Sequence, residues 1–245
     1  MNHDSSQRPS RPALLPLLGA CGGGDWVVTT WGEDYIEEGI PAAEFDDGCA
    51  VVFDSFAVQI TEAALLDGDG EVVGSVKAGG FELTEAGPQT VGDVDVKATH
   101  YDTARFVIGP AGGPSVRAAG TLTCGEGTVT FDWSFDRTTT YFCEPADLTV
   151  PKGGEIETEL TIHGDHLFYD GLENPDALLR GQPIVDADAD GDGVVTQDEL
   201  AAVDVAGLGY AVGQHSEVSD LGGFVDVLTQ TLGHVDGEGH CQVDL

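Results

Sequence analysis

TVTFDWSF, residues 128–135, alternates between polar and apolar side chains at every step. The apolar positions are Val129, Phe131, Trp133 and Phe135. Successive side chains of a β-strand point to opposite faces, so this spacing predicts a strand with one face in a core and the other in water. This buried strand is the starting point for predicting the fold.

Short runs of the same kind extend from residue 26 to residue 162, separated by turn sequences rich in Gly, Asp and Pro. The further runs are residues 26–30, 50–60, 71–76, 80–84, 93–98, 104–108, 116–124, 139–143 and 155–162. Many short strands at regular spacing, in a chain with 35 Gly, are typical of a β-sandwich. We therefore expect a mainly β fold, an antiparallel β-sandwich over residues 26–163.

The strand predicted at residues 155–162 also alternates. Ile156, Thr158, Leu160 and Ile162 are expected on the core face, and Glu155, Glu157, Glu159 and Thr161 on the solvent face. Continuing this period by one residue places His163 in the acidic, solvent-facing row.

After His163 the pattern becomes helical. Three helices are expected: residues 175–180 with Asn174 as N-cap, residues 196–205, and residues 224–232, whose Phe224, Leu228 and Leu232 share one face. The chain is expected to end in a loop over residues 233–245. Residues 164–245 thus form a small segment that we expect to pack on the sandwich.

Residues 188–199, DADGDGVVTQDE, resemble the calcium loop of EF-hands. Calcium takes six to eight oxygen ligands, and the resemblance implies the following set. The ligands are the carboxylates of Asp188, Asp190 and Asp192, the carbonyl of Val194, a water on Thr196 and both carboxylate oxygens of Glu199. Gly193 permits the sharp turn, and Val195 packs inward. Sensor EF-hands occur in pairs, so a lone loop predicts structural calcium; an acidic loop without metal is the alternative.

The chain carries 44 acidic and 9 basic residues, a formal net charge of −35. Such a surface repels nucleic acid and anionic lipids, which excludes nucleic acid as a partner. We interpret the overall charge as solvation, including adaptation to salt, and assign cation binding only to local clusters. A hydrophobic content of 41% excludes a disordered acidic tail.

Residues 1–21 contain two arginines, a short apolar run and then LGAC, which resembles a bacterial lipobox. The resemblance implies a signal peptide over residues 1–20, a lipid on Cys21 and a tether over residues 21–25. The apolar run is too short to span a bilayer. We expect an exported protein, anchored to the cell envelope by this lipid alone and facing the periplasm or the surface. A chance cysteine in an unstructured terminus is the alternative.

Four cysteines remain: Cys49, Cys124, Cys143 and Cys241. An even number in an exported protein predicts two disulfides, and four cysteines allow three pairings. We favour a Cys124–Cys143 bridge across a hairpin, with Cys49 joined to Cys241. A zinc site built from all four lacks any C-x2-C spacing.

Four histidines occur near turns late in the chain: His163, His166, His234 and His240. Imidazoles at such spacing suit copper or zinc, and we expect the four to meet at one end of the β-domain. The carboxylates of Asp165, Asp170 and Glu238 are candidates for secondary or substitute ligands. Surface histidines in polar loops are the alternative.

The β-domain with late histidines resembles, in architecture, the periplasmic copper-binding proteins of the MbnP-like family. The segments WGE at 31–33 and HGDHLFYD at 163–170 look like those of uncharacterised myxobacterial lipoproteins. Otherwise, residues 31–38 are interpreted as an acidic loop with aromatic anchors. The first resemblance makes copper one of the metals to consider, but it places no ligand of that family on this chain.

No nucleophile elbow, zinc-protease motif or phosphate-binding loop is present, so we do not expect an enzyme. The function expected from the sequence is an exported acidic lipoprotein that binds structural calcium and, at the histidine cluster, copper or zinc. Its partners are metal ions, and a protein partner is not indicated. The alternative is a calcium-stabilised surface adhesion or assembly module without a transition metal; a metal-dependent hydrolase ranks third.

Overall fold

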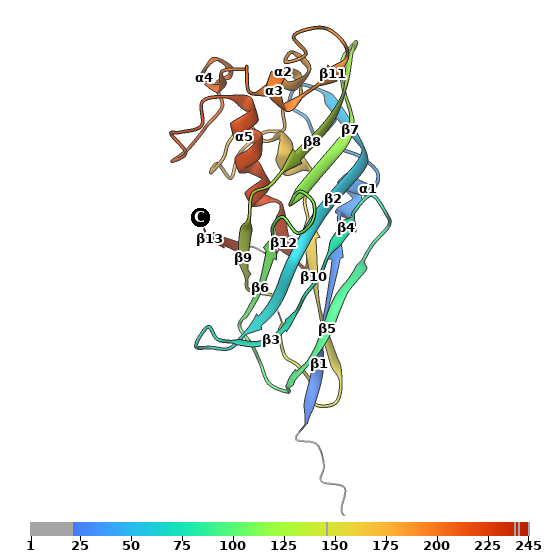
Figure 1. Cartoon of the computed structure of the whole chain (residues 1–245), viewed down its shortest axis with the longest axis vertical. Helices are drawn as coiled ribbons and strands as arrows, with labels where there is room; N and C mark the ends of the chain where they lie inside the picture. Colours follow the sequence, from blue (N-terminus) through green and yellow to red (C-terminus); the bar gives the residue numbers. More distant parts are fainter. Residues whose placement is uncertain (1–21, 146, 238, 240, 245) are drawn as a thin grey trace, which may run out of the picture.

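The computed structural model describes residues 22–145, 147–237, 239 and 241–244. The predicted signal peptide and Cys21 therefore lie outside the described residues. Within them the chain is mainly β, as expected, and forms a sandwich of two sheets with a helical segment at one end (Figure 1). No helix in the described part of the chain is long and apolar enough to cross a bilayer.

The larger sheet is built on one long strand, β2 (Cys49–Leu66). Its order is β11 (Val194–Val195), β8 (Gly127–Phe135), β7 (Val116–Cys124), β2, β6 (Thr103–Ile108), β9 (Thr139–Cys143) and β13 (Cys241–Asp244), while β3 (Val72–Val76) and β4 (Gly80–Glu82) also pair with β2. The first half of β2 pairs with β7 and the second half with β6. Register shifts near Phe53 and Thr61 mark bulges, which allow so long a strand to bend.

The smaller sheet has the order β12 (Gly233–Val235), β10 (Glu155–Ile162), β1 (Gly23–Trp31) and β5 (Gln89–Lys97). Most neighbouring strands are antiparallel, as predicted, but β1 runs parallel to β10 and β11 runs parallel to β8. Both parallel partners come from the later part of the chain, after long connections, which parallel pairing requires.

Between the sheets lies a single aromatic-rich core. The predicted apolar face of β8 is confirmed, because Val129, Phe131, Trp133 and Phe135 are all buried. The rings of Phe131 and Trp133 stack with centroids 4.4 Å apart. Alternation in the sequence thus located the buried face correctly.

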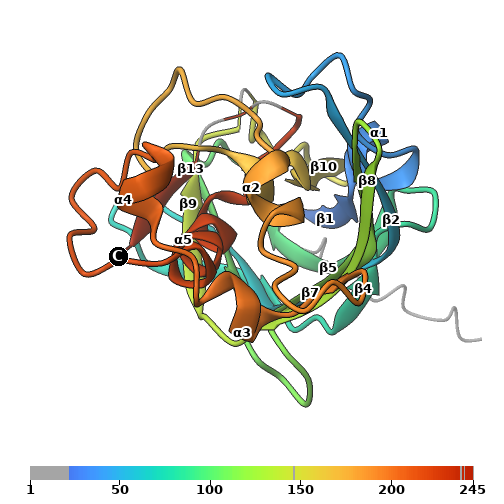
Figure 2. The ribbon, with the colours of Figure 1, turned by 90° about the horizontal axis from the view of Figure 1, so that it is seen from above.

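The helical segment contains short elements that gather over one end of the sandwich (Figures 1 and 2). The elements are η1 (Asp165–Phe168), α2 (Gln182–Val185), α3 (Gln197–Leu200), α4 (Val205–Leu208), α5 (Leu221–Leu228) and η2 (Thr229–Thr231); α1 (Glu33–Glu37) lies earlier in the chain. The expected burial of Phe224, Leu228 and Leu232 is confirmed. The helix predicted at residues 224–232 spans Leu221–Leu228 instead, so Leu232 lies beyond it; the earlier start comes from Asp220, which caps the helix by accepting the Gly223 N–H at 2.8 Å.

Three other predictions for this segment were wrong. Residues 175–180 form a turn rather than a helix, since the Asn174 side chain accepts the Asp176 N–H and closes an Asx turn. The helix predicted at residues 196–205 ends at Leu200, and the chain turns before α4. Residues 233–245 are not simply a loop, because they supply β12 and β13 as edge strands.

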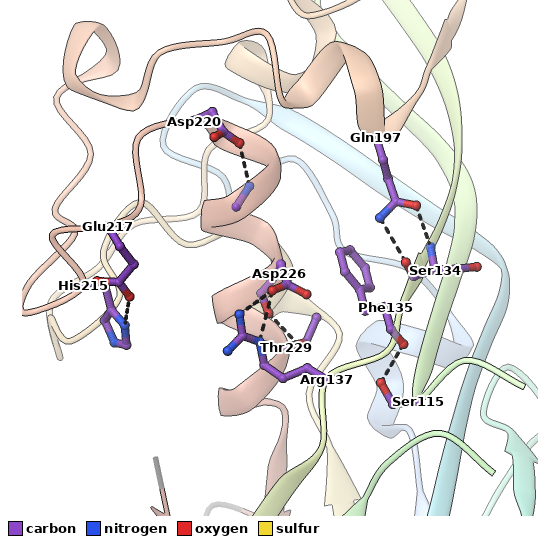
Figure 3. Close-up of polar contacts among 11 residues, drawn as sticks. Ser115, Ser134, Phe135, Arg137, Gln197, His215, Glu217, Asp220, Asp226 and Thr229 are labelled. Atoms are coloured by element: carbon purple, nitrogen blue, oxygen red, sulfur yellow. Dashed lines mark hydrogen bonds and ion pairs between the residues drawn. The ribbon is translucent and has the colours of Figure 1, made fainter.

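Side-chain contacts hold α3 and α5 against the sandwich (Figure 3). Gln197 makes two hydrogen bonds with the backbone of Ser134, donating to its carbonyl at 3.0 Å and accepting its N–H at 3.2 Å. Farther along, Arg137 forms an ion pair with Asp226 of α5. The helical segment is thus tied to the end of β8 and to the loop that follows it.

The two disulfides expected from the cysteine count are present, but the favoured pairing was wrong. Cys49 lies directly opposite Cys124 in the β2–β7 ladder, and Cys143 lies opposite Cys241 in the β9–β13 ladder. Cys124 and Cys143 do not face each other, because β9 leaves β8 and pairs with β6 instead. Sheet order, which spacing along the sequence does not reveal, sets the pairing.

Proteolysis of the unreduced protein should therefore release Cys49 linked to Cys124 and Cys143 linked to Cys241, as identified by mass spectrometry. Replacing Cys143 and Cys241 together by Ser should lower the free energy of unfolding by about 2–5 kcal/mol, because this bridge closes a loop with a sequence separation of 98. A pair of peptides linked through Cys124 and Cys143 would contradict the observed pairing of β2 with β7 and of β9 with β13.

Candidate metal centre

Pairing between β10 and β12 brings two distant histidine segments together. The strands are antiparallel, with Thr161 opposite His234, and the His163 N–H donates to the Leu232 carbonyl at 2.9 Å. The C-terminal end of β10 therefore meets the start of β12. The prediction that His163, His166 and His234 come together at one end of the β-domain is confirmed in geometry for these three residues.

The three rings are close enough to surround one ion. Ring centroids lie 4.3 Å apart for His163 and His234, 5.1 Å for His163 and His166, and 5.3 Å for His166 and His234. Asp165 joins the group, since one ligand atom from each of His163, Asp165 and His166 lies within 4.8 Å of the others. Ligands bonded at about 2.1 Å to one ion lie within about 4.2 Å of each other, so an ion would draw these atoms closer.

His163 is buried, which corrects its predicted place in a solvent-facing row. Its side chain is 5% exposed, and the preceding Thr161 is fully buried as well. The row stays exposed or half-buried from Glu155 to Glu159, where the alternation holds. Beyond that point β12 and the following turn cover it, and Thr161 donates to the Gly237 carbonyl at 2.8 Å. Residues more than 70 positions later in the chain supply the cover.

Glu33 orients the His163 ring. One oxygen of its carboxylate, Oε2, lies 3.2 Å from His163 Nδ1. An ionised carboxylate only accepts hydrogen bonds, so this contact places a hydrogen on Nδ1 and leaves Nε2 as the nitrogen that a metal ion would bind. Such carboxylate–histidine contacts orient imidazole ligands in metal sites. In His166, Nδ1 is held in a similar way, 3.1 Å from the Thr231 hydroxyl.

Two acceptor atoms of the cluster are buried without a hydrogen-bond partner among the described residues. They are His163 Nε2 and Asp165 Oδ1. The other oxygen of Asp165 accepts from the Tyr169 hydroxyl at 3.1 Å. Leaving a buried polar atom unsatisfied costs about 1–3 kcal/mol, and more where the atom is charged. A cation within reach of these atoms would lower this cost.

Burial also sets the protonation of the neighbouring groups. Burial, with His163 as a second cause, lowers the pKa of His166 to about 3, so its ring is neutral at physiological pH. Burial raises the pKa of the Asp165 carboxyl, while His163 and the Tyr169 hydroxyl act in the opposite direction. A neutral imidazole is the form that binds metal, so His166 needs no deprotonation to act as a ligand.

Other residues expected at this site are placed differently. His240 and Glu238 lie outside the described residues. Asp170 faces away, because its carboxylate accepts the Leu178 N–H at 2.9 Å and lies 3.9 Å from Arg180. The donor set that the described residues offer is therefore three imidazoles with the Asp165 carboxylate, rather than four imidazoles.

Sequence reasoning missed Glu33, which was interpreted as part of an acidic loop. The residue has a φ of +54°, a left-handed conformation that costs residues other than Gly about 1–2 kcal/mol. Strain of this kind persists where the surrounding structure enforces it, and it concentrates at functional sites. No signal in the sequence links Glu33 to a histidine 130 positions later.

The predicted calcium loop forms a compact acidic turn. Ligand atoms of Asp188, Asp190 and Asp192 lie within 4.8 Å of one another. Asp188 accepts three backbone N–H groups from across the turn, and Gly193 has the positive φ of 83° that the turn requires. Glu199 closes the loop by accepting the Ala189 N–H at 3.1 Å.

This loop pairs with the sandwich through β11. Val194 and Val195 lie beside Thr130 and Phe131 of β8, and the Trp133 indole donates to the Val195 carbonyl at 2.9 Å. These contacts hold the acidic turn against the edge of the larger sheet.

No protein-family model, curated protein or solved structure matches this chain. The inference of function therefore rests on the residues described above.

Glu33→Gly should be more stable than Glu33→Ala by about 1 kcal/mol, because both variants lose the carboxylate and only Gly relieves the left-handed conformation. Denaturant unfolding of the two metal-free variants gives this difference. Equal stabilities would show that the backbone at residue 33 is not strained.

Proposed function

We propose that the protein binds one transition-metal ion, copper or zinc, through His163, His166, His234 and Asp165. The observation that carries the proposal is the pair of buried acceptor atoms, His163 Nε2 and Asp165 Oδ1, within a group of three imidazoles. Imidazole nitrogen with carboxylate oxygen suits both metals. The architectural resemblance to the MbnP-like proteins is a reason to test copper alongside zinc.

The proposal is tested by titrating Cu²⁺ and Zn²⁺ into metal-free protein and measuring the metal content by mass spectrometry. We expect one equivalent to bind tightly. His163→Ala, His166→Ala and His234→Ala should each weaken binding by at least about tenfold, since each removes a ligand. His215→Ala is the matched control, because His215 lies between Glu173 and Glu217 in a separate loop.

If all four variants bound metal as tightly as the unmodified protein, the site would be refuted and the alternative, a calcium-stabilised adhesion or assembly module, would be favoured. Weakening in His215→Ala as large as in the other three would instead indicate nonspecific binding to an acidic surface. Protons should compete with the metal for His166 only as the pH approaches about 3, because burial lowers the pKa of its ring to that value.

We also propose that the loop at residues 188–199 binds calcium and that this calcium is structural. Its support is the ring of three carboxylates closed by Glu199 and the pairing of β11 with β8. A cation at this position would offset the repulsion among these carboxylates. The loop would then clip the helical segment to the edge of the sandwich.

Calcium should raise the melting temperature of the protein, and EGTA should reverse the effect. At 100 times its dissociation constant, a ligand that binds only the folded state adds about 2.7 kcal/mol. Glu199→Ala and Asp188→Ala should abolish this gain, whereas Asp198→Asn, an exposed carboxylate outside the ligand pattern, should retain it. If calcium did not change the melting temperature of the unmodified protein, the site would be ruled out.

We also propose that the protein is exported and anchored by a lipid. They rest on the lipobox-like sequence ending at Cys21. The two disulfides support export, because such bonds persist in oxidising compartments. In this proposal the protein holds its metal ions at the cell envelope, where extracellular calcium is available.

A further inference from the structure

The proposed transition-metal centre is buried, so an ion must reach it by a defined path. Asp165 is 7% exposed, and His163 is less exposed still. Two cavities border the cluster. The first includes Glu33, which contacts His163, and the second includes His166 itself together with Tyr169 and Thr231, which contact Asp165 and His166. One, of about 360 Å³, is lined by Trp31, Glu33, Asp34 and Tyr35. The other, of about 300 Å³, is lined by residues that include His166, Leu172 and Leu228.

Resting on the proposed function, we propose that the metal ion enters through the first cavity and that Glu33 is its first ligand. Glu33 lines the cavity and also contacts His163 Nδ1, so its carboxylate stands at the boundary between solvent and the cluster. Its side chain is 19% exposed, which leaves it accessible from outside. An incoming ion exchanges a water for this carboxylate and then exchanges the carboxylate for imidazole.

The side chains that line the two cavities make the first the better route for a cation. A hydrated divalent cation is attracted to negatively charged oxygens and is not attracted to an apolar surface. The first cavity offers the carboxylates of Glu33 and Asp34. The second cavity has a mainly apolar surface, and its one carboxylate, Glu173, accepts the Gln214 N–H at 3.2 Å and lies 3.7 Å from His215. In the second cavity His166 also has its Nδ1 engaged by Thr231.

The rim of the first cavity is held in place before any ion arrives. Trp31 donates its indole N–H to Glu37, across the start of α1, at 2.5 Å. Gly32 packs so closely on Leu83 that an added Cβ would lie 2.7 Å from the Leu83 side chain and carbonyl. This packing accounts for the strained conformation of Glu33, since the chain on one side of it has no room to relax. A fixed carboxylate at the mouth of a cleft focuses the field that attracts cations.

Rates of metal loading and release test the route, because a residue that only lets the ion pass and a residue that binds the ion affect these rates differently. Removing a group that serves only passage slows loading and release together and leaves the dissociation constant unchanged. Removing a ligand speeds release and weakens binding. Zn²⁺ loading is followed by stopped flow against a chromophoric chelator, and release is followed by transfer to excess chelator.

We expect Asp34→Asn, which changes a cavity residue outside the cluster, to slow loading and release by a similar factor, up to about tenfold at low salt and less at high salt. Glu33→Gln should slow loading further. Its lost contact with His163 should also weaken binding at equilibrium. Glu173→Gln, in the second cavity, is the matched control and should leave both rates unchanged. Circular dichroism confirms that each variant is folded.

Unchanged loading rates in both Asp34→Asn and Glu33→Gln would overturn the route while leaving the metal site intact. Slower loading in Glu173→Gln would overturn it in favour of the second cavity. If the unmodified protein bound neither Zn²⁺ nor Cu²⁺, the proposed function would be overturned, and the route with it. The two failures are thus distinguishable.

Discussion

The candidate metal centre depends on one backbone ladder, the three-residue pairing of β12 with β10. Without it His163 would end an exposed strand, as its sequence pattern suggests, and His234 would lie in an unattached tail. The ladder is short, so other contacts must hold it. Phe224, Leu228 and Leu232 are buried just before it, and the Cys143–Cys241 bridge follows it. Hydrophobic burial on one side and a covalent link on the other keep β12 in register.

Features of the candidate metal centre offset part of the stabilisation that the packing around β12 supplies. Glu33 is held in a left-handed conformation, and two acceptor atoms are buried without donors in the described structure. Each feature opposes folding by roughly 1–3 kcal/mol. Replacing Asp165 or His163 by an apolar side chain would remove such a cost, so stability does not explain why these residues are here. The proposed cation would account for them, because it would give the unsatisfied atoms a partner.

Local patterns in the sequence predicted what depends on local physics. Strands such as β7, β9 and β10 were predicted at the bounds observed, because alternation reflects which face meets the core. The meeting of His163, His166 and His234 was also predicted, from the need of the last helix to bury its apolar face. The disulfide pairing and the burial of His163 were wrong, because both depend on which strands become neighbours. Glu33 was missed because its role comes from tertiary packing of Gly32 and Leu83.

The two proposed ion sites occupy opposite ends of one continuous set of contacts. The acidic loop pairs with β8 through β11, and α3, which follows the loop, is fixed to Ser134. Residues of α3 pack on α5, whose Asp226 pairs with Arg137, and α5 continues directly into η2. There Thr231 contacts His166. If the loop binds calcium, loss of that ion would first weaken the contacts that hold α5. His166 contacts the segment that directly follows α5. Calcium in the loop would thereby contribute to the order of the histidine cluster without being one of its ligands, because both draw on the same packed helix.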